Sequence, residues 1–183
     1  MAIKFLLLVS RQGKIRLTKW FTSEWTAKEK TKITSQVSTI VLQRQSKMCN
    51  VLEFKGFQVV YKRYASLYFV AGTDIDENEL LALEIIHRYV EVLDKWFKNV
   101  CELDIIFNFQ QAYAIIDEIL IAGEMQESSK RVALTTLKRI EEVYFINKSM
   151  SANKLKLINL QFFNTLIKNN LSEVQFNQQL TTE

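Results

Sequence analysis

The sequence predicts an α/β (α+β) protein whose five-stranded, mainly antiparallel sheet has one helix on one face and a pair of helices on the other. Three observations indicate this fold class. Short apolar runs of strand length and one helical pattern fill residues 3–71. A long stretch with helical periodicity follows at 79–122. The resulting order, β-β-α-β-β-β-α-α, suits a sheet covered by helices on both faces.

The first two predicted strands form a hairpin. Residues 3–10 are apolar on both alternating faces, which is typical of a strand covered on both sides. Gly13 lies in the turn, where glycine readily supplies a positive φ. Residues 14–21 mix lysine and arginine with apolar residues, so we expect this second strand at an edge of the sheet.

The first helix begins at a capping box. Thr26 can accept from a backbone N–H, and Glu29 can accept in return from the N–H of Thr26. From this cap the helix should run to about Leu42. Three short strands follow, at about 51–55, 58–63 and 67–71.

The stretch 79–122 reads as two helices with a break at 99–102. The first carries two apolar stripes: Leu80, Leu83, Ile86, Val90, Leu93 and Phe97, and beside them Leu81, Ile85, Tyr89, Val92 and Trp96. A surface helix usually needs only one such stripe. We therefore expect this helix to contact a second surface besides its own core, although both stripes could equally be ordinary core.

The ends of the helix pair have their own signals. Asn99 tolerates the left-handed conformation that ends many helices, and Gly123 is expected to end the second helix. Residues 129–145 could form a further helix. We assign 1–146 to the main domain and 147–183 to a C-terminal extension of unknown role, which is either a docked amphipathic helix, the interpretation we favour, or a poorly ordered tail.

Composition argues against several classes of protein. The net charge of +4 permits acidic partners or anionic lipid, but without an arginine-rich block it does not indicate nucleic acid. Two cysteines suggest neither a disulfide framework nor a zinc site, which favours a reducing, cytosolic setting. The apolar run at the N-terminus is too short to span a membrane.

Catalytic and metal-binding patterns are also weak. Glu84 and His87 have the spacing of half a di-iron site, but His87 is the only histidine, so we expect it to be solvated or at an interface. Cys101 lies beside Glu102, which would raise a thiol pKa, and we expect a half-buried structural cysteine there. No glycine-rich phosphate loop or nucleophile elbow is present. We expect neither an enzyme nor a cofactor.

Longer strings resemble the small (sigma) subunits of clathrin adaptor complexes. The resemblance runs in order over about residues 1–140, and its strings are SRQGK at 10–14, RL at 16–17, KW at 19–20, VYKRYASLYF at 60–69, FKNVCELDIIFNF at 97–109, DE at 117–118 and AGE at 122–124. It implies a longin-like fold. It also implies a heterotetramer of two large adaptins, a medium subunit and this small chain, cradled by the N-terminal solenoid of a large adaptin.

Fewer residues indicate which type of clathrin adaptor complex the chain resembles. Gln12, Lys62 and the string at 47–49 look more like the trans-Golgi and endosomal adaptor, and no insertion of the third adaptor type separates Glu53 from Gln58. The residues at 53–54 and 122–124 also suit the plasma-membrane adaptor. The resemblance thus implies a cytoplasmic protein, held indirectly and peripherally on trans-Golgi or endosomal membranes and on clathrin-coated vesicles.

The resemblance further implies binding of acidic dileucine sorting signals in cargo tails. In these signals an acidic residue precedes a Leu-Leu or Leu-Ile pair by four positions. Arg16 matches the position for the acidic residue, and the positions around the leucines are Ala65, Leu67, Val90, Asn99, Val100 and Ile105. Each apolar residue taken alone could simply be core.

A free-standing longin domain, from a SNARE or a tethering complex, is the rival interpretation. A SNARE would need a long heptad helix after the domain, with a central arginine or glutamine layer. Residues 147–183 are too short for that helix and contain no arginine. We therefore prefer the adaptor subunit.

Overall fold

The computed structural model describes residues 2–45 and 47–144. The chain divides into two units, Met1–Leu137 and Lys138–Glu183. Residues 130–144 are helical, and 138–144 are the only part of the second unit that is described. The predicted extension at 147–183 lies outside the described residues, so the boundary at 146 stays a prediction.

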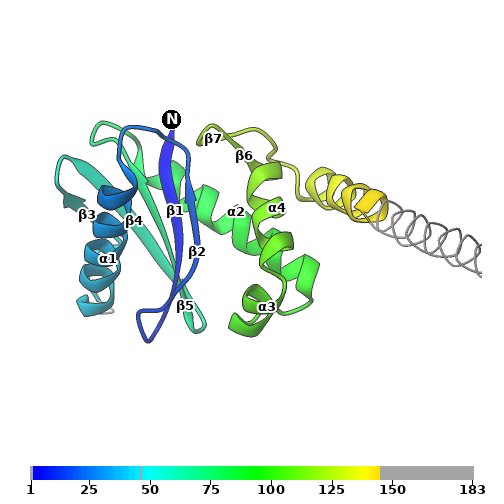
Figure 1. Ribbon diagram of the computed structural model, residues 1–183, viewed down its shortest axis with the longest axis horizontal. Coiled ribbons are helices and arrows are strands. Elements are labelled where there is room, and N and C mark those ends of the chain that lie inside the picture. Colours follow the sequence, from blue (N-terminus) through cyan, green and yellow to red (C-terminus); the bar gives the residue numbers. More distant parts are fainter. Residues whose placement is uncertain (1, 46, 145–183) are drawn as a thin grey trace, which may run out of the picture. The chain divides into compact units, whose positions relative to one another are not determined.

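Five strands of the first unit form one antiparallel sheet (Figure 1). Their order across the sheet is β2-β1-β5-β4-β3, so β2 is an edge strand, as predicted. The fold class predicted from the sequence is confirmed. The strands are β1 (Ile3–Ser10), β2 (Ile15–Trp20), β3 (Val51–Phe54), β4 (Phe57–Tyr64) and β5 (Leu67–Thr73).

The helices follow the predicted order, with one addition. The predicted capping box is present at the start of α1: the Thr26 N–H donates to Glu29 Oε2 over 2.8 Å, and the Glu29 N–H donates to Thr26 Oγ1 over 3.4 Å. The predicted second helix of the pair is two helices followed by a small hairpin. The elements are α1 (Ala27–Gln43), α2 (Glu79–Phe97), α3 (Glu102–Phe107), α4 (Phe109–Ile119), β6 (Leu120–Ile121) and β7 (Glu124–Met125).

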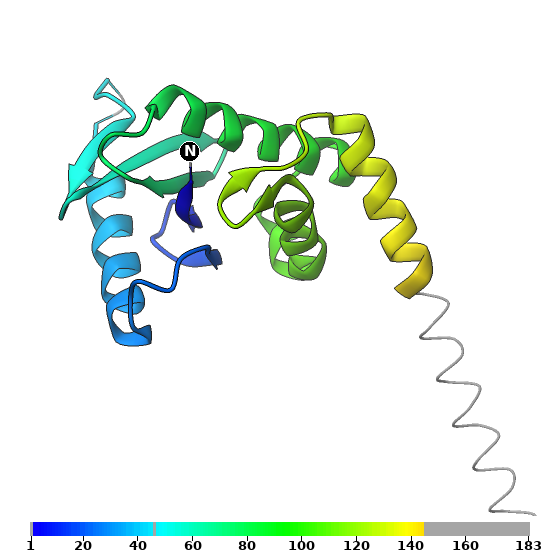
Figure 2. The same cartoon turned by 90° about the horizontal axis from the view of Figure 1, so that it is seen from above.

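The sheet carries a separate hydrophobic core on each face, with α1 and α2 on opposite sides (Figure 2). On β1, Phe5 and Leu7 pack with the buried residues of α1, whereas Leu6 packs with those of α2 and α4. Alternate residues of a strand face opposite sides, which explains why apolar residues occupy both faces of β1. The ring of Phe5 covers Gly72 on β5 and occupies the space that a Cβ atom there would need.

The chain itself buries most of both apolar stripes of α2, but Leu80 at the start of the first stripe is exposed. Ile85, Tyr89 and Val92 of the second stripe are buried, because α4 packs along this side of α2 while the sheet covers the other. The Tyr89 hydroxyl donates to the carbonyl of Ala112 over 3.1 Å, and its complete burial raises the tyrosine pKa well above 10.0. The expectation that the second stripe needs an outside partner is therefore wrong for most of its length. Leu81 is its exposed exception.

The turn at 122–123 replaces the helix end that the sequence suggested. Gly123 has a φ of +84°, but it lies in the hairpin between β6 and β7. Its carbonyl accepts from the Ile3 N–H over 2.7 Å. The hairpin is thereby attached to the start of β1, and α4 already ends at Ile119.

Candidate functional site

The predicted signal-binding residues come from several parts of the fold. Arg16 lies on β2, Val90 on α2 and Ile105 on α3. Ala65 is in the β4–β5 turn and Leu67 begins β5, while Asn99 and Val100 connect α2 to α3. The larger hydrophobic core includes Leu67, Val90, Ile105 and the half-buried Val100. The structure therefore brings four of the predicted apolar contacts into one cluster.

Most of that apolar surface is closed. Leu67 is 5% exposed, Val90 9% and Ile105 0%, so these side chains are core in this structure. Their role in binding a sorting signal stays a prediction. Val100 is half-buried, while Ala65 and Asn99 are exposed, with positive φ values of 50° and 74°. A ligand can reach these last three residues first.

The α2–α3 connection is held by hydrogen bonds from its flanks. Helix α2 ends where Lys98 takes a φ of 55°, and Asn99 continues in the left-handed region, which agrees with the predicted stop. The Val100 N–H donates to Asp94 Oδ1 over 3.2 Å, and the Cys101 N–H donates to Asp104 Oδ2 over 2.8 Å. The hydrogen bond from Cys101 holds the pKa of Asp104 below its ordinary value.

Arg16 already has an anionic partner, which sequence reasoning missed. Its Nε donates to Glu102 Oε1 over 2.8 Å, and its Nη2 lies 2.7 Å from the same oxygen. The two side chains are only 21% and 25% exposed. No local sequence pattern could pair Glu102 with a residue 86 positions away.

Helix α4 covers part of the free edge of β2. The Tyr113 hydroxyl accepts from the Thr18 N–H over 3.2 Å and donates to the Thr18 carbonyl over 3.1 Å. Lys19 Nζ lies 2.6 Å from Asp117 Oδ1. A side chain thus satisfies a backbone donor and acceptor that an edge strand would otherwise expose.

His87 and Cys101, the two residues weighed as a metal ligand and a reactive thiol, lie in different surroundings. The His87 ring stacks on Tyr64, and its Nδ1 lies 3.0 Å from the tyrosine hydroxyl. Cys101 is exposed, not half-buried as expected from the sequence. Within 2–45 and 47–144, no group of three or more His, Cys, Asp or Glu residues is arranged to hold a metal ion.

An ion-pair network joins the helical residues that begin at Lys130 to α2. Lys130 Nζ lies 2.6 Å from Glu91 Oε1, and Arg88 Nη1 lies 3.4 Å from Glu91 Oε2. The hydrogen bond from Lys130 is the largest cause of a lowered Glu91 pKa. This network fixes the start of the helical residues 130–137 beside the middle of α2.

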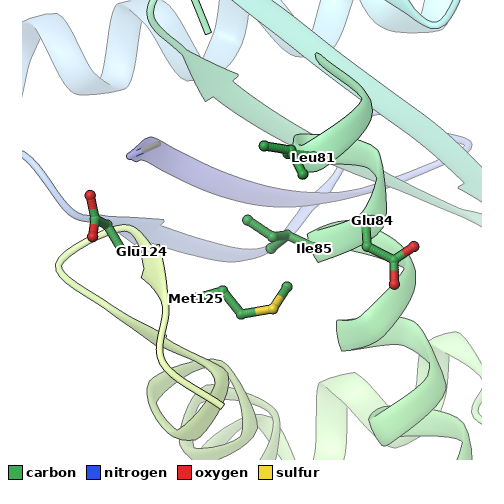
Figure 3. Close-up of a pocket in the computed structure, with 5 residues that line it drawn as sticks. All are labelled: Leu81, Glu84, Ile85, Glu124 and Met125. Atoms are coloured by element: carbon green, nitrogen blue, oxygen red, sulfur yellow. The ribbon is translucent and has the colours of Figure 1, made fainter. Parts of the chain in front are cut away.

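A cavity of about 320 Å³ lies between the N-terminal half of α2 and β7 (Figure 3). Leu81, Ile85 and Met125 form its apolar lining, and the carboxylates of Glu84 and Glu124 lie at its two ends. It contains no residue of the predicted signal-binding set. The exposed part of the second stripe of α2, at Leu81, opens into this cavity.

The α3–α4 corner presents a second apolar surface. Four large apolar side chains at this corner are exposed: Leu103, Ile106, Phe107 and Phe109. Exposed apolar groups that cluster in this way often mark a protein–protein contact.

A family model described as "Clathrin adaptor complex small chain" matches residues 2–144. The chain belongs to this family. It is a small subunit of a clathrin adaptor complex, and the resemblance seen in the sequence is confirmed. Where residues are described, no helix combines the length and apolar character needed to cross a membrane.

Relatives from distant organisms agree with this assignment. The chain is 58% identical over 137 residues to AP-1 complex subunit sigma-1 of Schizosaccharomyces pombe, an alignment that covers 75% of this chain and 84% of that protein. It is 51% identical over 156 residues to AP-1 complex subunit sigma-1 of Arabidopsis thaliana, covering 85% and 96%. It is 52% identical over 140 residues to human AP-1 complex subunit sigma-1A, covering 76% and 86%.

The fold has a counterpart among known structures. A chain from a structure titled "Homology model of the full-length AP-3 complex in a stretched open conformation" aligns with a TM-score of 0.63 and 28% identity. The alignment covers 80% of this chain and 98% of that one. The longin-like arrangement is thus that of an adaptor-complex chain.

Proposed function

We propose that this small subunit helps an AP-1-type adaptor bind acidic dileucine sorting signals, and so select vesicle cargo between the trans-Golgi network and endosomes. The observation that carries the proposal is the convergence of Leu67, Val90, Val100 and Ile105 in one cluster. Arg16 lies beside this cluster and forms an ion pair with Glu102, the first residue of α3. An apolar site with a cation at its edge suits a ligand that has two leucines and an acidic residue.

Leucine binding at this site requires the rim to move. The connection at 98–101 is the candidate for that motion, because it is short, left-handed at two residues and held through the carboxylates of Asp94 and Asp104. Val100 in this connection packs against the cluster that holds Val90 and Ile105, so we expect displacement of the connection to loosen that cluster. Burying two leucyl side chains would contribute roughly 3–6 kcal/mol before the costs of ordering and opening. We therefore expect weak, reversible binding.

We test this function with a paired substitution. Val100→Asp places a charge at the accessible rim, whereas Ile75→Asp changes an exposed residue in the loop after β5. Strand β5 begins at Leu67 beside the site and ends at Thr73, so Ile75 lies toward the other end of the sheet. Reconstituted complexes carrying Val100→Asp should lose binding of a dileucine peptide, and those carrying Ile75→Asp should keep it. Equal binding by both variants would refute the site.

Assembly with large adaptins is the second part of the proposal. The exposed apolar corner formed by Leu103, Ile106, Phe107 and Phe109 suits the solenoid surface of a large adaptin within a heterotetramer that also holds a second large subunit and a medium subunit. Expressed alone, the chain should self-associate, and co-expression with a large-adaptin trunk should yield a soluble complex. A stable monomer without affinity for such trunks would contradict this.

The identity of the large subunits that co-purify with this chain tests which compartment the adaptor serves. The plasma-membrane adaptor is the alternative, because residues 53–54 and 122–124 also suit it. The AP-1 names of the relatives favour a trans-Golgi and endosomal assignment, with a non-enzymatic subunit peripheral to the membrane on its cytoplasmic side. Purification from native cytosol should recover the large subunits of the trans-Golgi type. Recovery of plasma-membrane large subunits would overturn the assignment.

A further inference from the structure

We infer that Glu102 sets how strongly the acidic residue of a signal is recognised, because it competes for Arg16 inside the chain. This inference rests on the proposed function. The Arg16 guanidinium uses Nε and Nη2 on a single oxygen of Glu102, at 2.8 and 2.7 Å. Arginine has five N–H donors, so its Nη1 group remains geometrically able to meet another carboxylate.

The electrostatics of the pair oppose a second anion. Arg16 and Glu102 together carry no net charge, and both side chains are more than two-thirds covered. Salt and water screen such a pair less than a fully exposed one. An incoming carboxylate is attracted by Arg16 and repelled by Glu102, so the attraction available to the signal is reduced.

The position of Glu102 couples this competition to the leucine site. Glu102 is the first residue of α3 and follows Val100 by two positions. A displacement of the 98–101 connection that loosens the cluster through Val100 should therefore also act on the Arg16–Glu102 ion pair. Opening the apolar cluster and freeing Arg16 for a signal carboxylate would then occur in one motion.

The experiment compares two peptides on three assembled complexes. One peptide has Glu four positions before Leu-Leu, and the other has Gln at that position. The complexes carry the unchanged chain, Glu102→Gln or Asp117→Asn. Asp117→Asn is the matched control, because it also removes one negative charge from an ion pair between β2 and a helix. In that pair, Lys19 Nζ of β2 lies 2.6 Å from Asp117 Oδ1 of α4.

Glu102→Gln should tighten binding of the Glu peptide by about five-fold at low salt, the factor that corresponds to about 1 kcal/mol for one partly exposed ion pair. The gain should shrink as salt rises, because ions screen the freed charge. Binding of the Gln peptide should not change, and Asp117→Asn should affect neither peptide. If Glu102→Gln prevents assembly, Glu102→Asp, which keeps the charge but shortens the reach, should give a smaller gain.

The outcomes separate this inference from the proposed function. If the unchanged complex binds neither peptide, the proposed function fails and the inference fails with it. If the unchanged complex binds the Glu peptide but Glu102→Gln weakens that binding, Glu102 positions Arg16 instead of competing for it. An equal change for the Glu and Gln peptides would also overturn the inference, since the effect would not depend on the acidic residue.

Discussion

Val90→Asp is the substitution that best separates core from pocket at this site. Val90 is 9% exposed and belongs to the larger hydrophobic cluster. A carboxylate buried there without a partner costs several kcal/mol, and loss of the valine contacts adds roughly 1.5–2 kcal/mol. A domain of this kind has a total unfolding free energy of about 5–15 kcal/mol. We therefore expect this one change to remove most of the stability.

The assay is assembly of the co-expressed complex, followed by its thermal midpoint. Val90→Asp should yield little or no assembled complex on gel filtration. Val90→Ala removes two methyl-sized groups, so it should destabilise the chain by about 2–3 kcal/mol and lower the midpoint by roughly 4–10 °C. Val132→Asp is the control, because Val132 is 46% exposed and the same chemical change there should matter little.

One result would refute the reasoning. If Val90→Asp assembles and melts like Val132→Asp, the carboxylate reaches water and Val90 lines an open pocket instead of the core. Peptide binding by that complex would then report on the pocket directly. Loss of assembly in Val90→Asp alone, with Val90→Ala intermediate, would establish that the candidate site shares its side chains with the core.

Three further predictions use other parts of the fold. Arg16→Ser should weaken binding of an acidic dileucine peptide by about 0.5–1 kcal/mol in titrations, with a smaller loss at high salt. Gly72→Ala should destabilise the chain by about 1–3 kcal/mol through overpacking against an aromatic ring, whereas Gly56→Ala meets no neighbour and should show only the effect of its positive φ in urea unfolding. The hydrogen bond from Lys130 holds the Glu91 pKa below its ordinary 4.5. The stability that this ionised pair contributes is therefore present above pH 4.5 and is lost as pH falls through the lowered pKa. The difference in thermal midpoint between the unchanged chain and Lys130→Met should shrink in acid.

The strands and the two long helices could be predicted because their signals are local. The apolar run of β1, the capping box at α1 and the periodicity of α2 each depend on neighbours within a few residues. The second helix of the pair was predicted less well. A continuous apolar pattern runs through Asn108, yet α3 ends at Phe107, and the chain turns into the β6–β7 hairpin after Ile119. The hairpin is attached by the Ile3 N–H, a contact between distant parts of the chain.

Burial at the candidate site required the tertiary structure. Two apolar stripes on α2 predicted a helix with two covered sides, but the pattern could not say whether a partner or the chain itself covers the second. Helix α4 covers it, as the hydrogen bond from Tyr89 to Ala112 shows. Likewise, the family resemblance predicted which apolar residues would surround the leucines of a signal, but the accessibility of those residues depends on the neighbours packed against them.

This difference changes what the site residues imply about function. Because Leu67, Val90 and Ile105 are already packed, a leucyl ligand cannot simply enter beside them. It must replace contacts that the chain makes with itself, so ligand affinity should depend on how readily the covering segment opens. A substitution that loosens the 98–101 connection without touching the cluster should therefore strengthen peptide binding while it weakens stability. A substitution inside the cluster should weaken both.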